Sequence, residues 1–306
     1  MKVRVLGAAA GGAFPQWNCA CANCQLARSG SIRVRARTED SLAVSRDGDS
    51  WFLLNASPAI HAQIAASPCL WPRAGRASPI AGIVLTNGDV DHCLGLFQLR
   101  ESTPLVVYAT DAVFRGLERN VLLRTLQRFD GQLTHKRLRV GEATSLMLAS
   151  GEPSGLSIVP RAAQGKLPVH TDGLVPPSAE DNVALWVRDQ ESPRELAYAT
   201  AAASLDGIGP AFAALSAESC MFFDGTFWRD DELIELGLGK ARARDMAHLP
   251  IGGPSGSLAQ LSSVSARRIF THINNTNPIL DSESPERREV ERAGWEVAYD
   301  GLEVAL

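Results

Sequence analysis

The sequence predicts an α/β protein of two mixed β-sheets packed together, with helices on the outer faces. Short apolar segments typical of strands alternate with segments of helical periodicity, and the second half of the chain returns to the same theme. The 306 residues are 45% hydrophobic and 21% charged, which is ordinary for a globular protein with a sizeable core. No repeat or low-complexity linker divides the chain, so we expect a single domain spanning residues 1–306.

The first half predicts a hairpin followed by strands and crossover helices. A turn signal at Asp47-Gly48 separates Ser41–Ser45 from Trp51–Asn55, a pattern typical of a β-hairpin. Ser57-Pro58 offers a helix cap and a proline in the first turn, which predicts a helix running through Ile64. The other elements expected here are strands at Lys2–Leu6, Ile80–Leu85 and Leu105–Ala109 and helices at Leu94–Leu99 and Ala112–Phe129.

The second half predicts more strands than helices. Its apolar segments are short and end at polar or charged residues, as strands of a buried sheet do. The expected strands are Ser157–Pro160, Val183–Val187, Glu195–Ala199, Ser219–Asp224, Arg268–His272 and Trp295–Tyr299, and the expected helices are Phe212–Leu215 and Pro285–Ala293.

Charge and hydropathy exclude several classes of partner. The net charge is −4 and no run of basic residues is longer than two, so we expect neither a nucleic-acid nor a membrane partner. No apolar run approaches the roughly 18–20 residues of a membrane helix. Met1–Phe14 superficially resembles a signal peptide, but Gly7–Gly12 is too rich in glycine for its apolar core, and we expect a cytoplasmic protein.

Three of the six cysteines are crowded into Cys19-x-Cys21-x-x-Cys24. Thiolates at this spacing can converge on one soft cation, and zinc is the usual metal of tetrahedral sulfur-rich sites. We therefore predict a structural zinc at Cys19, Cys21 and Cys24, the alternative being three ordinary cysteines in a loop. The spacing does not identify a fourth ligand, because the next cysteine, Cys69, follows a different strand and helix.

A second signal follows an apolar strand. Asp89, Asp91 and His92 stand directly after Gly82–Leu85, at the carboxyl end of a strand, where side chains reach into a crevice. Two carboxylates and an imidazole suit iron, manganese or zinc. Taken alone, however, an Asp-x-Asp-His run is more often a solvated acidic turn.

Two later strands favour the metal interpretation. Asp224 ends the apolar strand Met221–Phe223, and His272 ends Ile269–Thr271. Either residue alone commonly marks where a sheet meets water, but three strands that end in metal-ligand types favour one shared site. His248 lies between them in the chain and is predicted as a general acid or base, the alternative being a packed or surface histidine.

At this point the motifs form a familiar series. They resemble the successive motifs of the pyrroloquinoline quinone (PQQ) biosynthesis protein B family, within the metallo-β-lactamase superfamily. This resemblance implies a four-layer αββα sandwich with the metal site at one edge, and a possible homodimer. The motifs are GAAAGGAFPQWNCACANC, TNGDVDHCLGLFQLRE, FFDGTFW, MAHLPIGGPSGS and FTHINNTNP.

The sequence departs from the superfamily's usual HxHxDH motif. Asn87 and Asp89 replace its first two histidines, which help to build one of two metal positions. The middle-chain histidine of that position has no convincing counterpart, since His170 lies in a loop-like context. The resemblance therefore implies one metal instead of two. The ligands that it implies are Asp91, His92, Asp224 and His272. A related phosphodiesterase branch shares the zinc loop and has a histidine as fourth zinc ligand where this chain has Asn275.

One ion held by two histidines and carboxylates, with open positions, is similar to the non-haem Fe(II) sites that activate dioxygen. The resemblance implies iron-dependent, O₂-using hydroxylation of the tyrosine-derived ring in a cross-linked Glu-Tyr precursor of PQQ, with Asp89 and His248 active in catalysis. Zinc is expected to replace Fe(II) during aerobic isolation, because it binds such ligands more tightly. The alternatives are a zinc-dependent hydrolase and a non-catalytic carrier of PQQ or its precursor, involved in transport.

A glycine-rich turn is the last candidate site. Gly252–Ser257 precedes the helix-like Leu258–Val264, and backbone N–H groups at a helix start can bind an anion. The PQQ precursor implied by the resemblance is rich in carboxylates. We therefore expect Ser255 and Gly256 to contact substrate, the alternative being a plain capped loop.

Overall fold

Two β-sheets of seven strands each form the centre of the structure, a computed structural model that describes residues 1–101 and 103–306. The first sheet, in spatial order, consists of β14 (Glu303–Ala305), β1 (Lys2–Gly7), β2 (Ser41–Ser45), β3 (Trp51–Leu54), β4 (Ile80–Val84), β5 (Leu105–Ala109) and β6 (Leu133–Arg137). The second consists of β13 (Trp295–Val297), β12 (Arg267–Thr271), β11 (Cys220–Asp224), β10 (Glu195–Ala199), β9 (Val183–Asp189), β8 (Pro153–Ala162) and β7 (Thr144–Met147).

Both sheets are mixed, as the sequence predicts. In the first sheet the pairs β14–β1, β1–β2 and β2–β3 are antiparallel, whereas the pairs β3–β4, β4–β5 and β5–β6 are parallel. In the second, β7 to β10 are antiparallel and β10 to β13 are parallel. The carboxyl ends of neighbouring parallel strands lie at one edge of each sheet, which is where the candidate ligands follow.

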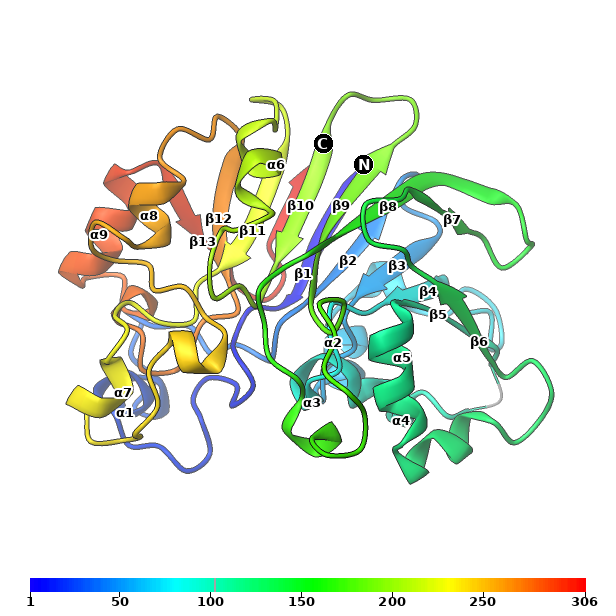
Figure 1. Ribbon diagram of the computed structural model, residues 1–306, viewed down its shortest axis with the longest axis horizontal. Helices are drawn as coiled ribbons and strands as arrows, with labels where there is room; N and C mark the ends of the chain where they lie inside the picture. The colour runs from blue at the N-terminus through cyan, green and yellow to red at the C-terminus, as the bar shows by residue number, and fades with distance from the viewer. Residues whose placement is uncertain (102) are drawn as a thin grey trace.

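Helices cover the outer face of each sheet (Figure 1). On the first sheet lie α2 (Ile60–Ala65), α3 (Val90–Cys93), α4 (Gly95–Gln98) and α5 (Asp111–Glu118). On the second lie α1 (Ala22–Arg28), α6 (Gly209–Ala213), α8 (Ser257–Gln260) and α9 (Pro285–Arg292). Helix α7 (Glu232–Glu235) follows β11 in the chain. Short 3₁₀ helices occupy Pro68–Leu70, Val121–Leu126, Val169–Thr171, Arg244–Met246 and Pro278–Leu280.

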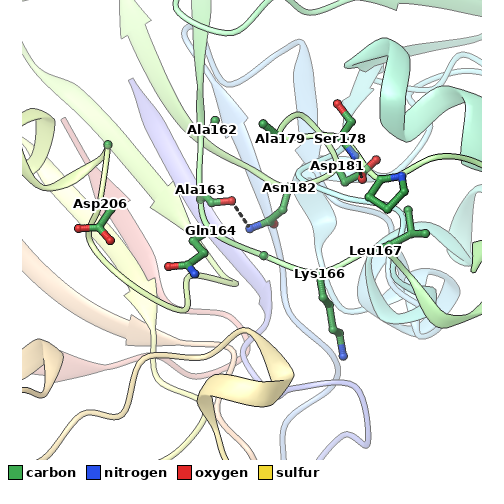
Figure 2. Close-up of a pocket in the computed structure, with 13 residues that line it drawn as sticks. Ala162, Ala163, Gln164, Lys166, Leu167, Ser178, Ala179, Asp181, Asn182 and Asp206 are labelled. Carbon is green, nitrogen blue, oxygen red and sulfur yellow. Dashed lines mark hydrogen bonds between the residues drawn. The ribbon is translucent and has the colours of Figure 1, made fainter.

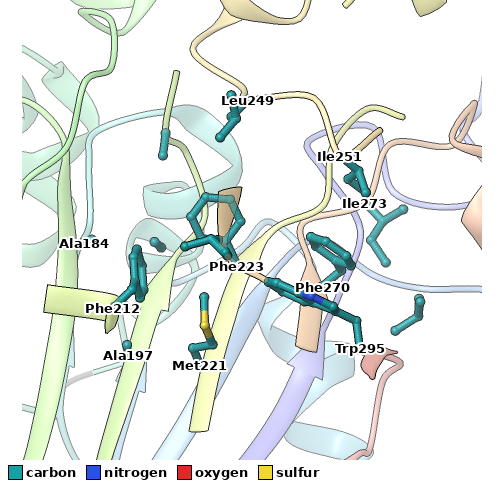
Figure 3. Close-up of a cluster of buried hydrophobic side chains, with 14 of the residues drawn as sticks. Ala184, Ala197, Phe212, Met221, Phe223, Leu249, Ile251, Phe270, Ile273 and Trp295 are labelled. Atoms are coloured by element: carbon teal, nitrogen blue, oxygen red, sulfur yellow. The ribbon is translucent and has the colours of Figure 1, made fainter. Parts of the chain in front are cut away.

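Three hydrophobic cores separate the four layers. Strand β11 shows how period-two alternation builds two of them: Phe222 faces the core between the sheets, whereas Met221 and Phe223 face the core under the outer helices. Figure 3 shows that outer core, in which Phe270 stacks on Trp295 with ring centroids 4.1 Å apart. The four-layer αββα sandwich expected from the sequence is therefore confirmed.

The expected helix over Ala112–Phe129 is wrong in its second half. Helix α5 ends at Glu118, and the Asn120 side chain accepts a hydrogen bond from the N–H of Leu122 at 3.0 Å, which starts a separate 3₁₀ helix. The apolar residues of the segment keep a helical spacing on both sides of this break. Local capping by an asparagine thus overrides the periodicity.

Six elements have no counterpart in the expected set: α1, α3, α7, β6, β7 and β14. The strands are three to five residues long and carry polar or charged side chains, so they show no apolar pattern. Three of them lie at or next to a sheet edge, where one side faces solvent. Over the described ranges, none of the helices is long and apolar enough to cross a membrane.

Candidate metal centre

The expected ligands meet at the edge of the sandwich where β4, β11 and β12 end. Asp91 and His92 follow β4 of the first sheet, and Asp224 and His272 come from β11 and β12 of the second. A pocket of about 210 Å³ opens here between the two sheets. The site is thus built by segments up to 181 residues apart in the chain.

Three of the four expected ligands face one another across this pocket. Asp91 Oδ2 lies 3.2 Å from His272 Nε2 and 3.5 Å from His92 Nε2. The ligand atoms of Asp91, His92 and His272 all lie within 4.8 Å of one another. His92 Nε2 is buried and has no hydrogen-bond partner among the described residues. An unpartnered imidazole nitrogen aimed at a carboxylate and a second imidazole fits a metal ligand.

Asp224 belongs to a different cluster, although the sequence places it with the other three. Its Oδ1 accepts hydrogen bonds from the N–H and hydroxyl of Thr226, at 3.0 and 2.6 Å. Its Oδ2 lies 2.7 Å from His248 Nδ1. The second group of possible ligands is accordingly Asp224, His248 and His272, with His272 common to both.

Burial and neighbouring charges shift the pKa values of Asp91, His92 and His272. Burial alone would raise the pKa of Asp91, but His92 and His272 outweigh it and hold the pKa well below its usual range. Burial alone would lower the pKa of His272, yet the hydrogen bond with Asp91 and nearby carboxylates raise it to about 9. Burial lowers the pKa of His92.

Asn87, at the first histidine position of the usual motif, orients a metal ligand. Its Oδ1 lies 2.9 Å from His92 Nδ1, and its Nδ2 donates to Asn182 Oδ1 at 3.2 Å. Because an amide oxygen only accepts, His92 carries its proton on Nδ1 and presents the lone pair of Nε2 to the pocket. The sequence shows the lost histidine but not this role, which depends on how the loop after β4 folds.

A buried polar network continues behind His92. Thr86 Oγ1 lies 3.3 Å from His92 Nδ1 and donates to Asn55 Oδ1 at 3.0 Å. Asn55 Nδ2 donates to the hydroxyl of Tyr198 at 3.3 Å, and that hydroxyl donates to Asp40. Burial raises the pKa of Asp40 to about 6.

Asp40 joins the two sheets beneath the metal centre. Besides the hydroxyl of Tyr198, it accepts a hydrogen bond from the hydroxyl of Thr271, the residue before His272. The same carboxylate thus connects the segment that holds His92 with the strand that holds His272. Nothing in the local sequence around Asp40 indicates this, because its partners lie at least 158 residues away.

The two residues expected in catalysis line the pocket. His248 stacks on His272, with ring centroids 5.2 Å apart and planes inclined by 26°. Asp89 lies at the start of α3, where its N–H donates to Asn87 Oδ1 at 2.9 Å. Gly11 also lines the pocket, and an added Cβ there would lie 3.2 Å from the Asp91 carboxylate. The N-terminal glycine-rich loop therefore approaches the metal centre directly.

The remaining histidines lie elsewhere. His170 is exposed in a 3₁₀ helix and belongs to neither ligand cluster, so it does not complete the lost metal position. His61 contacts the carbonyl of Gln98, and His135 stacks on Phe114 in strand β6. None of these three histidines belongs to a ligand cluster.

A larger cavity of about 460 Å³ adjoins the metal pocket. Lys166 lines both spaces, and Figure 2 shows its side chain extending away from Ala163 and Asn182. Asn182 forms part of the wall, since its Nδ2 donates to the carbonyl of Ala163 at 3.3 Å (Figure 2). Lys166 could not be recognised from the sequence, because a single lysine in a loop carries no pattern.

The three expected zinc ligands also come together. The sulfur atoms of Cys19, Cys21 and Cys24 lie within 4.8 Å of one another at the start of α1. Asn275 Nδ2 lies 3.5 Å from Cys21 Sγ and 3.4 Å from Cys24 Sγ. Asn275 is thus the neighbour of the thiols at the position where the phosphodiesterase branch has histidine. The arrangement fits a sulfur-rich structural site with an amide at its fourth side.

The free backbone amides expected at the glycine-rich turn are not free. The N–H groups of Gly256 and Ser257 donate to the carbonyls of Gly253 and Pro250 at 3.1 and 2.8 Å. Neither Ser255 nor Gly256 lines the metal pocket. The turn thus uses two of its backbone donors internally, and contact of Ser255 and Gly256 with substrate stays a prediction.

Known proteins share both the sequence and this architecture. Residues 50–273 match the model of the β-lactamase superfamily domain. The chain is 43% identical to coenzyme PQQ synthesis protein B of Methylococcus capsulatus and 41% identical to that of Stutzerimonas stutzeri, each over the full length of both proteins. The crystal structure of Zn²⁺-bound PqqB from Methylobacterium extorquens superposes with a TM-score of 0.90 at 38% identity, covering all of both chains.

Proposed function

The chain belongs to the coenzyme PQQ synthesis protein B family of the β-lactamase superfamily, and from this premise we propose a function in PQQ biosynthesis. The proposed reaction is hydroxylation, dependent on Fe(II) and O₂, of the tyrosine-derived ring in a cross-linked Glu-Tyr precursor. One atom of O₂ enters the ring and the other leaves as water, so the substrate or an added reductant supplies two electrons.

The observation that carries this proposal is the ligand set. Asp91, His92 and His272 form a group of one carboxylate and two imidazoles, the combination that non-haem Fe(II) oxygenases use. Fe(II) bound there supplies the activation of dioxygen. The second metal position that a hydrolase would use lacks its histidines, and Asn87 is engaged in orienting His92.

The surrounding residues position the ligands and move protons. Asp224 accepts two hydrogen bonds from Thr226, whose hydroxyl also lies 2.8 Å from His272 Nδ1. This fixes the orientation of the His272 ring with Nε2 toward Asp91. His248, paired with Asp224 and lining the pocket, is placed to exchange a proton with the ring hydroxyl of the substrate.

The cavities support a substrate larger than the metal pocket. The pocket holds about 210 Å³, below the roughly 300–1,000 Å³ of typical small-molecule sites, and the adjoining cavity adds about 460 Å³. Lys166 borders both and has no ion pair with any described carboxylate. We therefore place the reacting ring in the metal pocket and a carboxylate of the precursor beside Lys166.

The test compares two metal forms of one protein. Apo-protein is loaded anaerobically with Fe(II) or with Zn(II), mixed with a Glu-Tyr-derived substrate and ascorbate, and exposed to isotopically labelled O₂. Mass spectrometry should show one labelled oxygen atom in the product of the Fe(II) form only. Equal hydroxylation by the Zn(II) form excludes the iron assignment, and hydrolysis products with Zn(II) support the hydrolase alternative.

Variants separate metal binding from proton transfer. His92→Ala and His272→Ala should lose bound Fe(II) and turnover together, whereas His170→Ala, a matched exposed histidine, should keep both. His248→Ala should retain iron while turnover falls about 10²–10⁴-fold, the usual range for a lost acid–base group. Asp89→Ala should likewise lower turnover more than iron affinity. Loss of iron from the His248 variant would instead make His248 a ligand.

A further inference from the structure

A second group of basic side chains surrounds a cavity of about 370 Å³ beside the edge strand β13. Four arginines line it: Arg33, Arg35, Arg37 and Arg287. This arginine cavity shares no lining residue with the metal pocket or with the cavity next to it. Its chemistry is therefore independent of the proposed oxygenase reaction.

Arg37 is buried without a counter-ion. The residue is 6% exposed, and its guanidinium donates to the carbonyls of Ala298 and Arg35 at 2.9 and 2.6 Å. It forms no ion pair with any carboxylate that the structure describes. The negative charge of Asp300 raises the pKa of Arg37, but the Asp300 carboxylate accepts its hydrogen bonds from Thr38 and not from Arg37. A buried guanidinium that lacks an anionic partner is costly.

Neighbouring positive charges increase that cost. Burial lowers the pKa of Arg37 to about 10, and the charges of Arg287 and Arg35 contribute in the same direction. Arg35 is exposed and lies over the ring of Tyr299, 4.2 Å from its centroid. Trp295 also lines the cavity, and its buried Nε1–H has no hydrogen-bond partner within the described ranges. Two carboxylates, Glu291 and Glu296, also line the cavity, but they pair with Arg287 and Arg267 at 2.8 and 2.7 Å. Arg35 and Arg37 therefore keep no anionic partner among the described residues.

The geometry points to a binding site for a small multivalent oxyanion, with carboxylate or phosphate groups, in the arginine cavity. Such a ligand supplies the counter-charge that Arg37 lacks and relieves the repulsion between Arg35, Arg37 and Arg287. The volume lies within the roughly 300–1,000 Å³ range of small-molecule sites. Tyr299 and Val297 in the lining provide an apolar surface for the body of the ligand.

The probes are inorganic phosphate and benzene-1,3,5-tricarboxylate, titrated separately by calorimetry into the zinc-loaded full chain at low ionic strength. At least one should bind, and added salt should weaken it. Arg35→Ala and Arg287→Gln should each lower the affinity about tenfold or more, with zinc content unchanged. Arg139→Ala, an exposed arginine paired with Glu142 elsewhere, is the matched control and should bind like the parent protein.

Each outcome decides the question. Binding of the tricarboxylate alone assigns an organic carboxylate, and binding of phosphate alone assigns a phosphate compound. Absence of binding at millimolar concentration overturns the site, as does binding that neither Arg35→Ala nor Arg287→Gln weakens. Arg37→Met removes the buried charge itself, and its binding is compared only if its thermal unfolding matches that of the parent protein. If Arg37→Met does not fold, Arg35→Ala and Arg287→Gln decide the outcome.

Discussion

Asn87 is the residue at which this chain differs most tellingly from a two-metal hydrolase. In place of an imidazole ligand it offers an amide oxygen 2.9 Å from His92 Nδ1. The Asn87 side chain therefore selects the tautomer of His92 that carries its proton on Nδ1. In this tautomer Nε2 is free to bind a metal.

Asn87→Ala should consequently weaken metal binding about 10–100-fold, the usual effect of removing such an orienting partner. Competition with a coloured chelator measures the affinity. Asn87→Asp is the matched control: it keeps an acceptor for His92 and should bind metal more tightly than the alanine variant. Equal affinities for the alanine variant and the parent protein would contradict the orienting role.

The raised pKa of Asp40 predicts that the free energy of unfolding depends on pH. Its pKa rises from 3.8 in the unfolded chain to about 6 in the folded protein, because burial disfavours the charged form. The folded protein thus holds this proton more tightly. The contribution of Asp40 to the free energy of unfolding is therefore largest below pH 3.8 and is lost as pH rises through about 6.

Asp40→Asn removes this titration. The difference in unfolding free energy between the parent and Asp40→Asn should shift by about 2 kcal/mol in favour of the variant between pH 4 and pH 7. Chemical denaturation of both proteins in the same metal state measures it. A difference that is independent of pH would show that Asp40 does not titrate in this window.

At the scale of elements, we expect the cysteine loop and α1 to depend on one metal. Helix α1 has seven residues and no side-chain cap, so we expect a zinc bound by Cys21 and Cys24 to stabilise its start. Replacing Cys19, Cys21 and Cys24 with serine should remove about one zinc per chain and lower the melting temperature, because metal binding is coupled to folding. Unchanged zinc content in a folded variant would reject the site.

A substitution at Asn275 should strengthen zinc binding, whereas the serine replacements should remove it. Its amide lies beside the sulfur atoms of Cys21 and Cys24. Asn275→His should place an imidazole, a stronger zinc ligand than an amide, at the same position and slow the loss of zinc to a chelator. Faster zinc loss from this variant would mean that the position does not face the metal.

At the scale of the whole molecule, the proposed reaction depends on one metal position lying where two sheets meet. The double change Asn87→His with Asp89→His restores HxHxDH. It should draw in a second metal, measured by elemental analysis, and suppress hydroxylation, because His92 loses its amide partner and the pocket gains a competing ion. Intact hydroxylation with two bound metals would refute the link between the lost position and the function.

Much of this architecture follows from local pattern. Strand β5, strand β10 and the hairpin of β2 and β3 were predicted within a residue or two, because buried strands and tight turns are specified by adjacent residues. Cys19, Cys21 and Cys24 are likewise specified by spacing. The motifs around Asp91, His92 and His272 identified the family and the metal edge.

Tertiary structure decided the rest. The sequence placed Asp224 with Asp91 and His92, yet folding pairs it with His248, since side-chain direction at a strand end depends on the neighbouring loops. The role of Asp40 and the arginine cavity arise from contacts between segments far apart in the chain. Residue type and strand position are local properties that a sequence displays, whereas the partner of a buried polar group is chosen only when the two sheets pack together.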